Sequence, residues 1–214
     1  MFVSRTQAGQ QLAQKLKLVL QDFTGSEVIV LSIPRGGVVV GRELATALAC
    51  QHDIIVTRKL QSSGDRELAL GAVGSLKGSL YLNEKLLSDL HINHSYLEKE
   101  IARQQQEIDR RTSLYRQNQA TLSLAGKTVI IADDGAATGA TIIAAAREVW
   151  EQNPHQVLIA VPVLPLDTLQ LLEKEVDAVY YLEVPQQFFA VGQFYQEFPQ
   201  VSDEEVAEIL CEKI

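Results

Sequence analysis

The stretch TVIIADDGAATGAT, residues 128–141, places two adjacent acids between an apolar run and a tract of small residues. Its apolar run, residues 128–132, is typical of a strand buried on both faces of a parallel sheet. Asp133 and Asp134 follow at once, and two like charges side by side repel each other. The glycines, alanines and threonines after them have few side-chain atoms with which to pack. Both features indicate that something outside the chain stabilises this turn.

Other short apolar runs have the length of buried strands; they are residues 28–33, 54–57, 157–162 and 178–182. Helical patterns lie between the strands, at residues 38–50, 141–152 and 167–175. Because strand and helix alternate, we expect an α/β fold with a doubly wound, mostly parallel sheet flanked by helices.

Two more helices carry start signals of the capping-box type. Ser95 with Glu98 opens a helix that runs to about Tyr115, and Ser202 with Glu205 opens the last one. The charged segment RQQQEIDRR, residues 103–111, is expected to be a solvated face, with a regulatory contact as the alternative.

Two segments interrupt the alternation. Residues 60–83 contain glycines and two short alternating runs, which predict a flexible hairpin or lid. Residues 184–200 are rich in Phe and Tyr without clear periodicity, which predicts a small hood over one end of the sheet. We therefore expect residues 1–214 to form a single domain with these two appendages.

The composition excludes some classes of protein. The chain has 27 acidic and 19 basic side chains, for a net charge of -8, and this disfavours a nucleic-acid binder. Cys50 and Cys211 lie far apart and are expected to be free thiols. No apolar run approaches the ~18 residues that a membrane span needs, and the first residues do not resemble a signal peptide. We expect a cytoplasmic protein with no membrane or nucleic-acid partner.

The turn after the acids has the chemistry of a phosphate site. Ligands of open parallel sheets bind beyond the carboxyl ends of the strands, and a helix expected to start near Thr138 would present free amides there. Small residues let an anion approach those amides, and two hydroxyls can donate to it; the candidates are Gly135, Ala136, Ala137, Thr138, Gly139, Ala140 and Thr141. Asp133 and Asp134 can accept hydrogen bonds from a ribose diol or hold the waters of Mg²⁺. An ordinary strand–turn–helix with Asp as N-cap is the alternative.

Two further segments offer positive groups at neighbouring strand ends. In SIPRGGVVVG, residues 32–41, Gly36 and Gly37 would expose amides at a helix start and Arg35 adds a cation. In VTRKL, residues 56–60, Arg58 and Lys59 end the second predicted strand. The alternatives are a plain turn and ordinary solvated charges. Arg66 and Glu67, further along the lid, are weaker candidates.

The segment VIIADDGAATGAT resembles the phosphoribosyl pyrophosphate (PRPP) signature of type I phosphoribosyltransferases, and the resemblance extends from about residue 27 to residue 198. The chain is similar to bacterial members whose substrate is unassigned, some of them fused to hydrolase domains. The resemblance implies the type I phosphoribosyltransferase fold. It also implies that Asp133 and Asp134 bind the ribose hydroxyls and that the amides of residues 136–141 bind the 5-phosphate.

The resemblance further implies an activity. The phosphoribosyl group of PRPP would pass to a small nitrogen nucleophile, releasing pyrophosphate, with Mg²⁺ held through water by the two acids. Asp133, Asp134, Arg35 and Lys59 would have the catalytic roles, and the lid would exclude water. The pyrophosphate would contact Arg35, Gly36, Gly37, Arg58 and Lys59. The family often has a cis peptide before the basic residue of this loop, which implies a cis Pro34–Arg35 bond, and homodimers are usual in this fold.

The segment VPQQFFAVGQFYQEF, residues 184–198, resembles the hood of hypoxanthine–guanine enzymes, where an aromatic ring stacks on the base. Phe188 or Phe189 would stack on the acceptor, with Tyr195 nearby; alternatively these rings are the core of a small cap. Two departures argue against a 6-oxopurine acceptor. Ala137 stands where those enzymes carry an acid, and LIAVPVLP, residues 158–165, has no lysine to read the 6-oxo group.

These departures leave two rival functions open. One is a regulatory protein that senses PRPP or a nucleotide without catalysis. The other is a hydrolase or phosphatase that acts on a phosphosugar.

Overall fold

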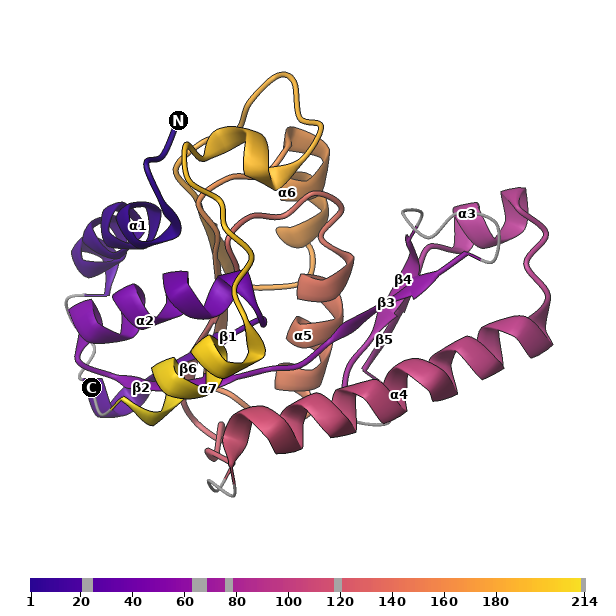
Figure 1. The fold of residues 1–214 in the computed structure, drawn as a ribbon, viewed down its shortest axis with the longest axis horizontal. Coiled ribbons are helices and arrows are strands. Elements are labelled where there is room, and N and C mark those ends of the chain that lie inside the picture. The colour runs from indigo at the N-terminus through magenta and orange to yellow at the C-terminus, as the bar shows by residue number, and fades with distance from the viewer. Residues whose placement is uncertain (21–24, 63–68, 76–78, 118–120, 213–214) are drawn as a thin grey trace.

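The computed structural model describes the chain apart from residues 21–24, 63–68, 76–78, 118–120 and 213–214. Its centre is a five-stranded sheet in the order β2-β1-β6-β7-β8, and all neighbouring strands are parallel (Figure 1). The strands are β1 (Val28–Ser32), β2 (Gln51–Ile54), β6 (Thr128–Ala132), β7 (Gln156–Ala160) and β8 (Ala178–Tyr180). The predicted parallel α/β sheet is confirmed.

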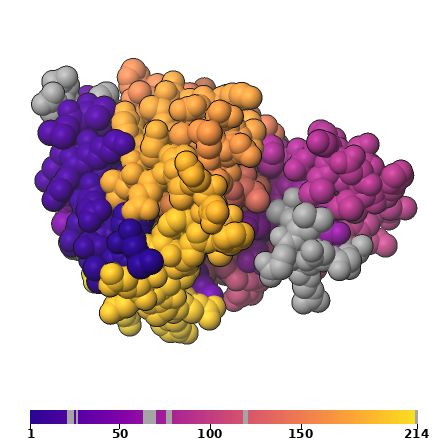
Figure 2. All heavy atoms as spheres, turned by 90° about the horizontal axis from the view of Figure 1, so that it is seen from above, coloured from indigo at the N-terminus to yellow at the C-terminus, as the bar shows by residue number. Residues whose placement is uncertain are grey.

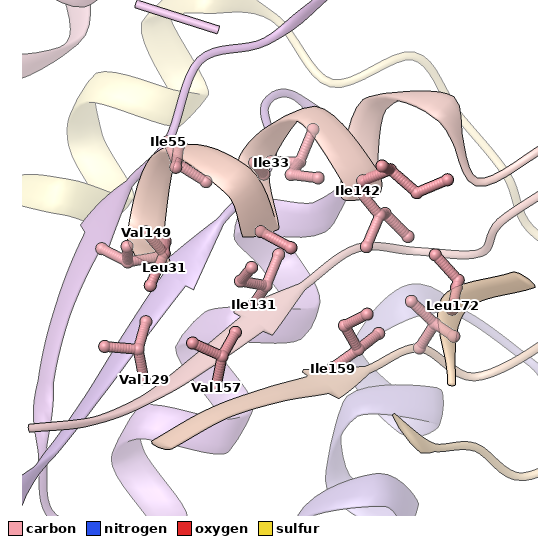
Figure 3. Packing of buried hydrophobic residues seen from close by; sticks show 14 of the residues in the cluster. Leu31, Ile33, Ile55, Val129, Ile131, Ile142, Val149, Val157, Ile159 and Leu172 are labelled. Atoms are coloured by element: carbon pink, nitrogen blue, oxygen red, sulfur yellow. The ribbon is translucent and has the colours of Figure 1, made fainter. Parts of the chain in front are cut away.

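Both faces of this sheet are covered by helices, because alternate strand residues point to opposite sides. On one face, Ile131 and its neighbours pack against α5 (Ala140–Trp150) and α6 (Leu166–Leu172), as Figure 3 shows. On the other face, Ile130 and its neighbours pack against α1 (Arg5–Val19) and α2 (Gly36–Leu48). The helices that were expected between the strands are present. The sheet is therefore doubly wound.

The first helix, α1, is absent from the sequence-based expectations. Ser4 caps it by accepting a hydrogen bond from the amide of Gln7. Ala8, Leu12 and Leu16 recur every fourth residue and are fully buried; Leu12 and Leu16 pack against α2 and the sheet, and Ala8 packs in the core of the hood region. That spacing after a Ser is a helix signal that the sequence does contain.

A second, smaller sheet projects beside the first. It consists of the antiparallel strands β3 (Arg58–Gln61), β4 (Ala69–Val73) and β5 (Leu80–Leu82), in that order. Figure 2 shows the lobe that carries α3 (Glu84–Asp89) and the start of α4 (His94–Arg116), in magenta, standing out from the body. The expected antiparallel hairpin is present within this sheet, whereas its motion as a lid stays a prediction. Arg66 and Glu67 lie outside the described residues.

The prediction that residues 54–57 form a strand ending in Arg58 and Lys59 is wrong. β2 ends at Ile54, and Arg58 begins β3 in the other sheet. The run is apolar because it crosses between two cores. Ile55 packs under the parallel sheet, while Ile54 and Val56 pack with the smaller sheet and α4. Burial, and not strand pairing, explains its composition.

Helix α4 runs along the smaller sheet (Figure 1). Its N-cap is Asn93, whose side chain accepts from the amide of Ser95, so the predicted Ser95 cap is wrong. The expected solvated face over residues 103–111 is present in part: Arg103, Gln106, Asp109 and Arg110 are exposed, whereas Gln104 is buried against β3. α7 (Asp203–Cys211) packs on α4 and is capped by Ser202 as predicted.

The hood region has its own small core. Phe194 of the 3-10 helix η2 (Val191–Phe194) packs with Phe2 and Tyr195, and the amide of Phe2 donates to the Phe194 carbonyl. A second 3-10 turn, η1 (Gly25–Glu27), precedes β1. Cys50 is buried and Cys211 is exposed, and the two do not form a disulfide. Over the described residues, we find no helix with the length and apolar character to cross a membrane.

Candidate active site

The loops that follow β1 and β6 meet at one edge of the parallel sheet. These strands are neighbours, with Ser32 opposite Ala132. From this pair the chain winds outward in two directions, to β2 on one side and to β7 and β8 on the other. Such a switch point is where open α/β sheets bind ligands. A cavity of about 360 Å³ lies here; its lining includes Pro34, Thr57, Arg58, Lys59, Gln61, Arg111, Val191, Asp133, Asp134, residues 135–139 and Thr141.

The two acids lie on the floor of this cavity at the end of β6. Asp133 Oδ1 accepts a hydrogen bond from the Asp134 amide at 2.8 Å. Asp134 Oδ2 accepts from Arg5 Nε at 2.6 Å, and these two side chains are only 15% and 9% exposed. The cation beside the acidic pair thus comes from the first turn of α1, which sequence reasoning missed.

Arg5 also joins Asp134 to the hood. Its Nη1 donates to the Pro199 carbonyl at 2.7 Å, and its guanidinium lies 3.7 Å from the centre of the Phe198 ring. The Tyr195 hydroxyl donates to the Asp134 carbonyl at 2.6 Å. Tyr195, expected near the acceptor, is therefore a buried residue that fixes the backbone of the acid, and burial raises its pKa.

The electrostatics of the acidic pair favour a positive ligand. Burial and the adjacent charge of Asp134 raise the pKa of Asp133, and Lys59 opposes this shift. Burial likewise raises the pKa of Asp134, with Arg5 opposing it. Burial in this site therefore disfavours the ionised form of both acids, and the adjacent charge of Asp134 adds to this effect at Asp133. A divalent cation, or hydroxyl groups that donate to the carboxylates, would oppose this effect.

The loop from Gly135 to Gly139 forms one wall of the cavity. Gly135 is required by close packing, since a Cβ there would lie 2.6 Å from Val191 Cγ1. The Ala136 amide donates to the Val163 carbonyl at 3.0 Å, so it is not open to a ligand as the sequence-based expectation had it. Ala137 and Thr138 are exposed.

The end of this loop presents amides at a helix start. Gly139 has φ +71° and is the N-cap of α5, which begins at Ala140, two residues after the position near which its start was expected. The Thr168 hydroxyl on α6 fixes the loop by donating to the Ala137 carbonyl at 2.6 Å. Within the described part of the chain, the amides of Ala137, Thr138 and Gly139 have no hydrogen-bond partner. Free amides beside the positive end of α5 form a site for an anion.

The second predicted anion loop has a different arrangement. The predicted cis Pro34–Arg35 bond is present, and Pro34 lines the cavity. The Arg35 side chain, however, faces Asp203 of α7 at 3.6 Å and does not line it. Gly36 and Gly37 pack the start of α2 against the acids: a Cβ on Gly36 would overlap the Asp134 carboxylate, and one on Gly37 would approach the Ala132 carbonyl at 2.9 Å.

Another part of the cavity wall is cationic. Arg58 and Lys59 line it as predicted, and Arg111 of α4 joins them. Arg58 Nε donates to Gln104 Oε1 at 3.0 Å, and Arg111 Nε donates to Glu107 Oε1 at 2.7 Å. Burial lowers the pKa of Arg58, and the charge of Arg111 lowers it further. Sequence reasoning missed Arg111, although its spacing of two helical turns from Gln104 places both on one helix face.

The hood touches the cavity through Val191 and not through its phenylalanines. Phe188 packs on Phe194 with ring centroids 5.2 Å apart, and Phe189 is 85% exposed. The structure therefore does not bring either predicted stacking residue to the cavity.

Comparisons with known proteins agree with this geometry. Residues 70–197 match the family model described as "Phosphoribosyl transferase domain". The chain is 38% identical over 210 residues to the Mycobacterium tuberculosis protein "Putative phosphoribosyl transferase Rv0571c". That match covers 98% of this chain and 46% of the relative, so the chain spans about half the length of this curated relative.

Solved structures are similar as well. TT1426 from Thermus thermophilus is 38% identical with a TM-score of 0.79, and the match covers 98% of this chain and 97% of that one. The AQ2163 protein from Aquifex aeolicus is 14% identical with a TM-score of 0.54, covering 97% of this chain and 85% of that one. At this identity, the second likeness shows the fold alone.

Proposed function

This chain belongs to the phosphoribosyl transferase family, and we propose that it transfers the 5-phosphoribosyl group of PRPP to a small nitrogen nucleophile with release of pyrophosphate. One observation carries the proposal. A single cavity is lined by Asp133 and Asp134, by the open amides before α5 and by the cations of β3 and α4. A pentose that bears a phosphate at one end and a pyrophosphate at the other needs these three kinds of group.

Each part of PRPP has its own contacts in this proposal. The 5-phosphate binds the amides of Ala137, Thr138 and Gly139, with the hydroxyls of Thr138 and Thr141 as further donors. The ribose hydroxyls donate to Asp133 and Asp134. The pyrophosphate lies toward Arg58 and Lys59, the side from which Lys59 already affects the pKa of Asp133.

The acidic pair also fits Mg²⁺. Asp133 forms no ion pair among the described residues, and its carboxylate lies next to that of Asp134 at the cavity, so two oxygen-bearing groups are available to one cation. Asp133 and Asp134 would hold the ion through its waters, because Mg²⁺ keeps several waters and takes carboxylate oxygens. When bound, the ion would neutralise charge on the departing pyrophosphate.

Different side chains stabilise different charges during the reaction. The bond between ribose C1 and the pyrophosphate oxygen breaks, and a bond from the acceptor nitrogen to C1 forms on the opposite face. Arg58 and Lys59 stabilise the negative charge of the leaving group, while the two carboxylates stabilise positive charge on the ribose ring. Ala137 supplies no base, so either the attacking nitrogen has no proton to lose or another residue accepts that proton.

A sensor without catalysis is the second candidate, and Ala137 is the residue that favours it. Incubation with PRPP and Mg²⁺ across purines, pyrimidines and nicotinate-like acids separates the candidates by measuring pyrophosphate. A transferase releases it only with an acceptor. A sensor binds PRPP but releases none with any acceptor, and a hydrolase releases it at a useful rate in water alone.

We also propose a homodimer and a cytoplasmic location, from the family resemblance and from two cysteines that are not joined in a disulfide. Sedimentation velocity tests the first proposal and cell fractionation the second.

A further inference from the structure

The charge of the pyrophosphate must be matched by cations that reach the cavity. The sequence assigned this part to Arg35, but Arg35 faces Asp203 on α7. Gly36 and Gly37 are packed against the acidic pair. The β1 loop therefore contributes no basic side chain to the cavity lining among the residues described.

The cations that do line this cavity come from β3 and α4. Arg58 and Lys59 belong to β3, and Arg111 reaches the same space from the C-terminal half of α4. The Arg111 side chain is 20% exposed and is held by its Nε–Glu107 bond of 2.7 Å. Its two terminal nitrogens have no hydrogen-bond partner within the described ranges.

This wall has an excess of positive charge. Arg58 has only the neutral Gln104 as hydrogen-bond partner in the described structure. Glu107 is the carboxylate nearest to Arg111, and it is shared with Arg110, which donates to it at 2.8 Å. Close cations without matching anions repel each other in a partly buried site. In a protein with net charge -8, such a wall is suited to an anionic ligand.

We infer that Arg111 binds the pyrophosphate group of PRPP and of the product, in the place that the sequence assigned to Arg35. This inference rests on the proposed function. The planar guanidinium matches two phosphate oxygens at once, which an ammonium group cannot do. Glu107 holds the guanidinium from behind, so little side-chain freedom is lost when the anion binds.

The structure also explains why α4 can hold Arg111 in position. Gln104 lies two turns earlier on the same face of α4, where it accepts from Arg58 and donates to Glu100 at 2.8 Å. Gln104 and Glu100 are both buried. The helix is thus fixed to β3 beside the cavity, and Arg111 and Arg58 are placed by the same contact.

Calorimetric titration with Mg–pyrophosphate and with ribose 5-phosphate tests the inference. We expect Arg111→Gln to weaken pyrophosphate binding by at least about tenfold and to leave ribose 5-phosphate binding unchanged. The pyrophosphate affinity of Arg111→Lys should lie between that of Arg111→Gln and that of the unaltered protein. Arg110→Gln is the matched control: Arg110 shares Glu107 but does not line the cavity, so its pyrophosphate affinity should stay within about twofold.

Several outcomes would overturn the inference. One is that Arg111→Gln binds pyrophosphate with unchanged affinity, or loses as much affinity for ribose 5-phosphate as for pyrophosphate. Another is that Arg110→Gln loses as much pyrophosphate affinity as Arg111→Gln, or that Arg35→Gln loses more. Thermal unfolding of each variant shows whether it is folded. If Arg111→Gln does not fold, Arg111→Lys replaces it in the comparison of the two affinities. Failure of the unaltered protein to bind PRPP or pyrophosphate contradicts the proposed function, whereas binding that ignores Arg111 contradicts only this inference.

Discussion

Arg5 and Asp134 lie 129 positions apart in the sequence and form a nearly buried ion pair, with Nε 2.6 Å from Oδ2. Through this pair the N-terminal helix holds one of the two acids on the cavity floor. The same guanidinium lies on Phe198 and donates to the Pro199 carbonyl. The position of the acid therefore depends on α1 and the hood together.

Replacing Arg5 should destabilise the protein and weaken ligand binding together. Arg5→Gln leaves the Asp134 carboxylate buried without its cation, which costs about 3 kcal/mol of unfolding free energy. Urea unfolding measures this loss. Arg42→Gln removes a more exposed ion pair, with Glu43, and should cost about 0.5 kcal/mol. Similar losses in the two variants would contradict the importance of the Arg5 pair.

Asp133→Asn should raise stability while it abolishes PRPP binding. Because the folded state raises the pKa of Asp133 above its ordinary value of 3.8, ionisation at neutral pH destabilises the fold. The amide side chain of the variant carries no charge, so a gain of about 1 kcal/mol is expected at about pH 7.5.

The stability difference between Asp133→Asn and the unaltered protein should depend on pH. Below the unfolded-state pKa, Asp133 is protonated in both states, so the variant and the unaltered protein should differ little. The difference in unfolding free energy between the two proteins should increase as the pH rises through the folded-state pKa of Asp133, because only the unaltered protein then buries a charge. Thermal unfolding from about pH 4 to about pH 8 measures this difference in stability. A difference that decreases with rising pH would show that the fold stabilises Asp133 as an anion.

Gly36→Ala should disturb the acids directly. The new Cβ would overlap the Asp134 carboxylate, so either α2 or the acid must move, at a cost of about 2 kcal/mol. Gly126→Ala is the control, since Gly126 has φ +71° but nothing within 4 Å of its Cβ position. It should lose about 1 kcal/mol through backbone strain and keep its PRPP affinity. Equal PRPP affinity in both variants would show that the packing of Gly36 against the Asp134 carboxylate does not matter for PRPP binding.

Thr168 should support the phosphate loop from α6. Thr168→Val removes the hydroxyl that donates to the Ala137 carbonyl, and about 1 kcal/mol of ribose 5-phosphate affinity should be lost, or roughly fivefold. Thr168→Ser keeps the hydroxyl and should bind almost normally. Titration calorimetry compares the two; if both bind equally well, the hydroxyl does not order the loop.

The sequence was sufficient to predict the parallel sheet and the loop after β6. Residues 128–132 form a strand with the predicted bounds, and the acids and small residues follow it in a local turn. Local signals of this kind depend on strand periodicity and turn chemistry alone. Ala136 was less well placed, because the contact of its amide with the Val163 carbonyl depends on packing across the sheet.

Contacts made between distant segments were not predictable in the same way. Arg5 meets Asp134 only after α1 has packed on the sheet, and Arg111 reaches the cavity only because α4 lies along β3. Arg35 was expected at the pyrophosphate, with a plain turn as the alternative, and its ion pair with Asp203 of α7 follows neither expectation. Residues 54–57 resembled a strand because two cores bury them.

Binding of Mg–PRPP by the unaltered protein and by the double variant Asp133→Asn, Asp134→Asn tests the central claim most directly. The measurement is titration calorimetry, with circular dichroism to establish that the double variant is folded. We predict that the unaltered protein binds PRPP and that the folded double variant does not. A folded double variant that binds Mg–PRPP with normal affinity would contradict the assignment of the cavity.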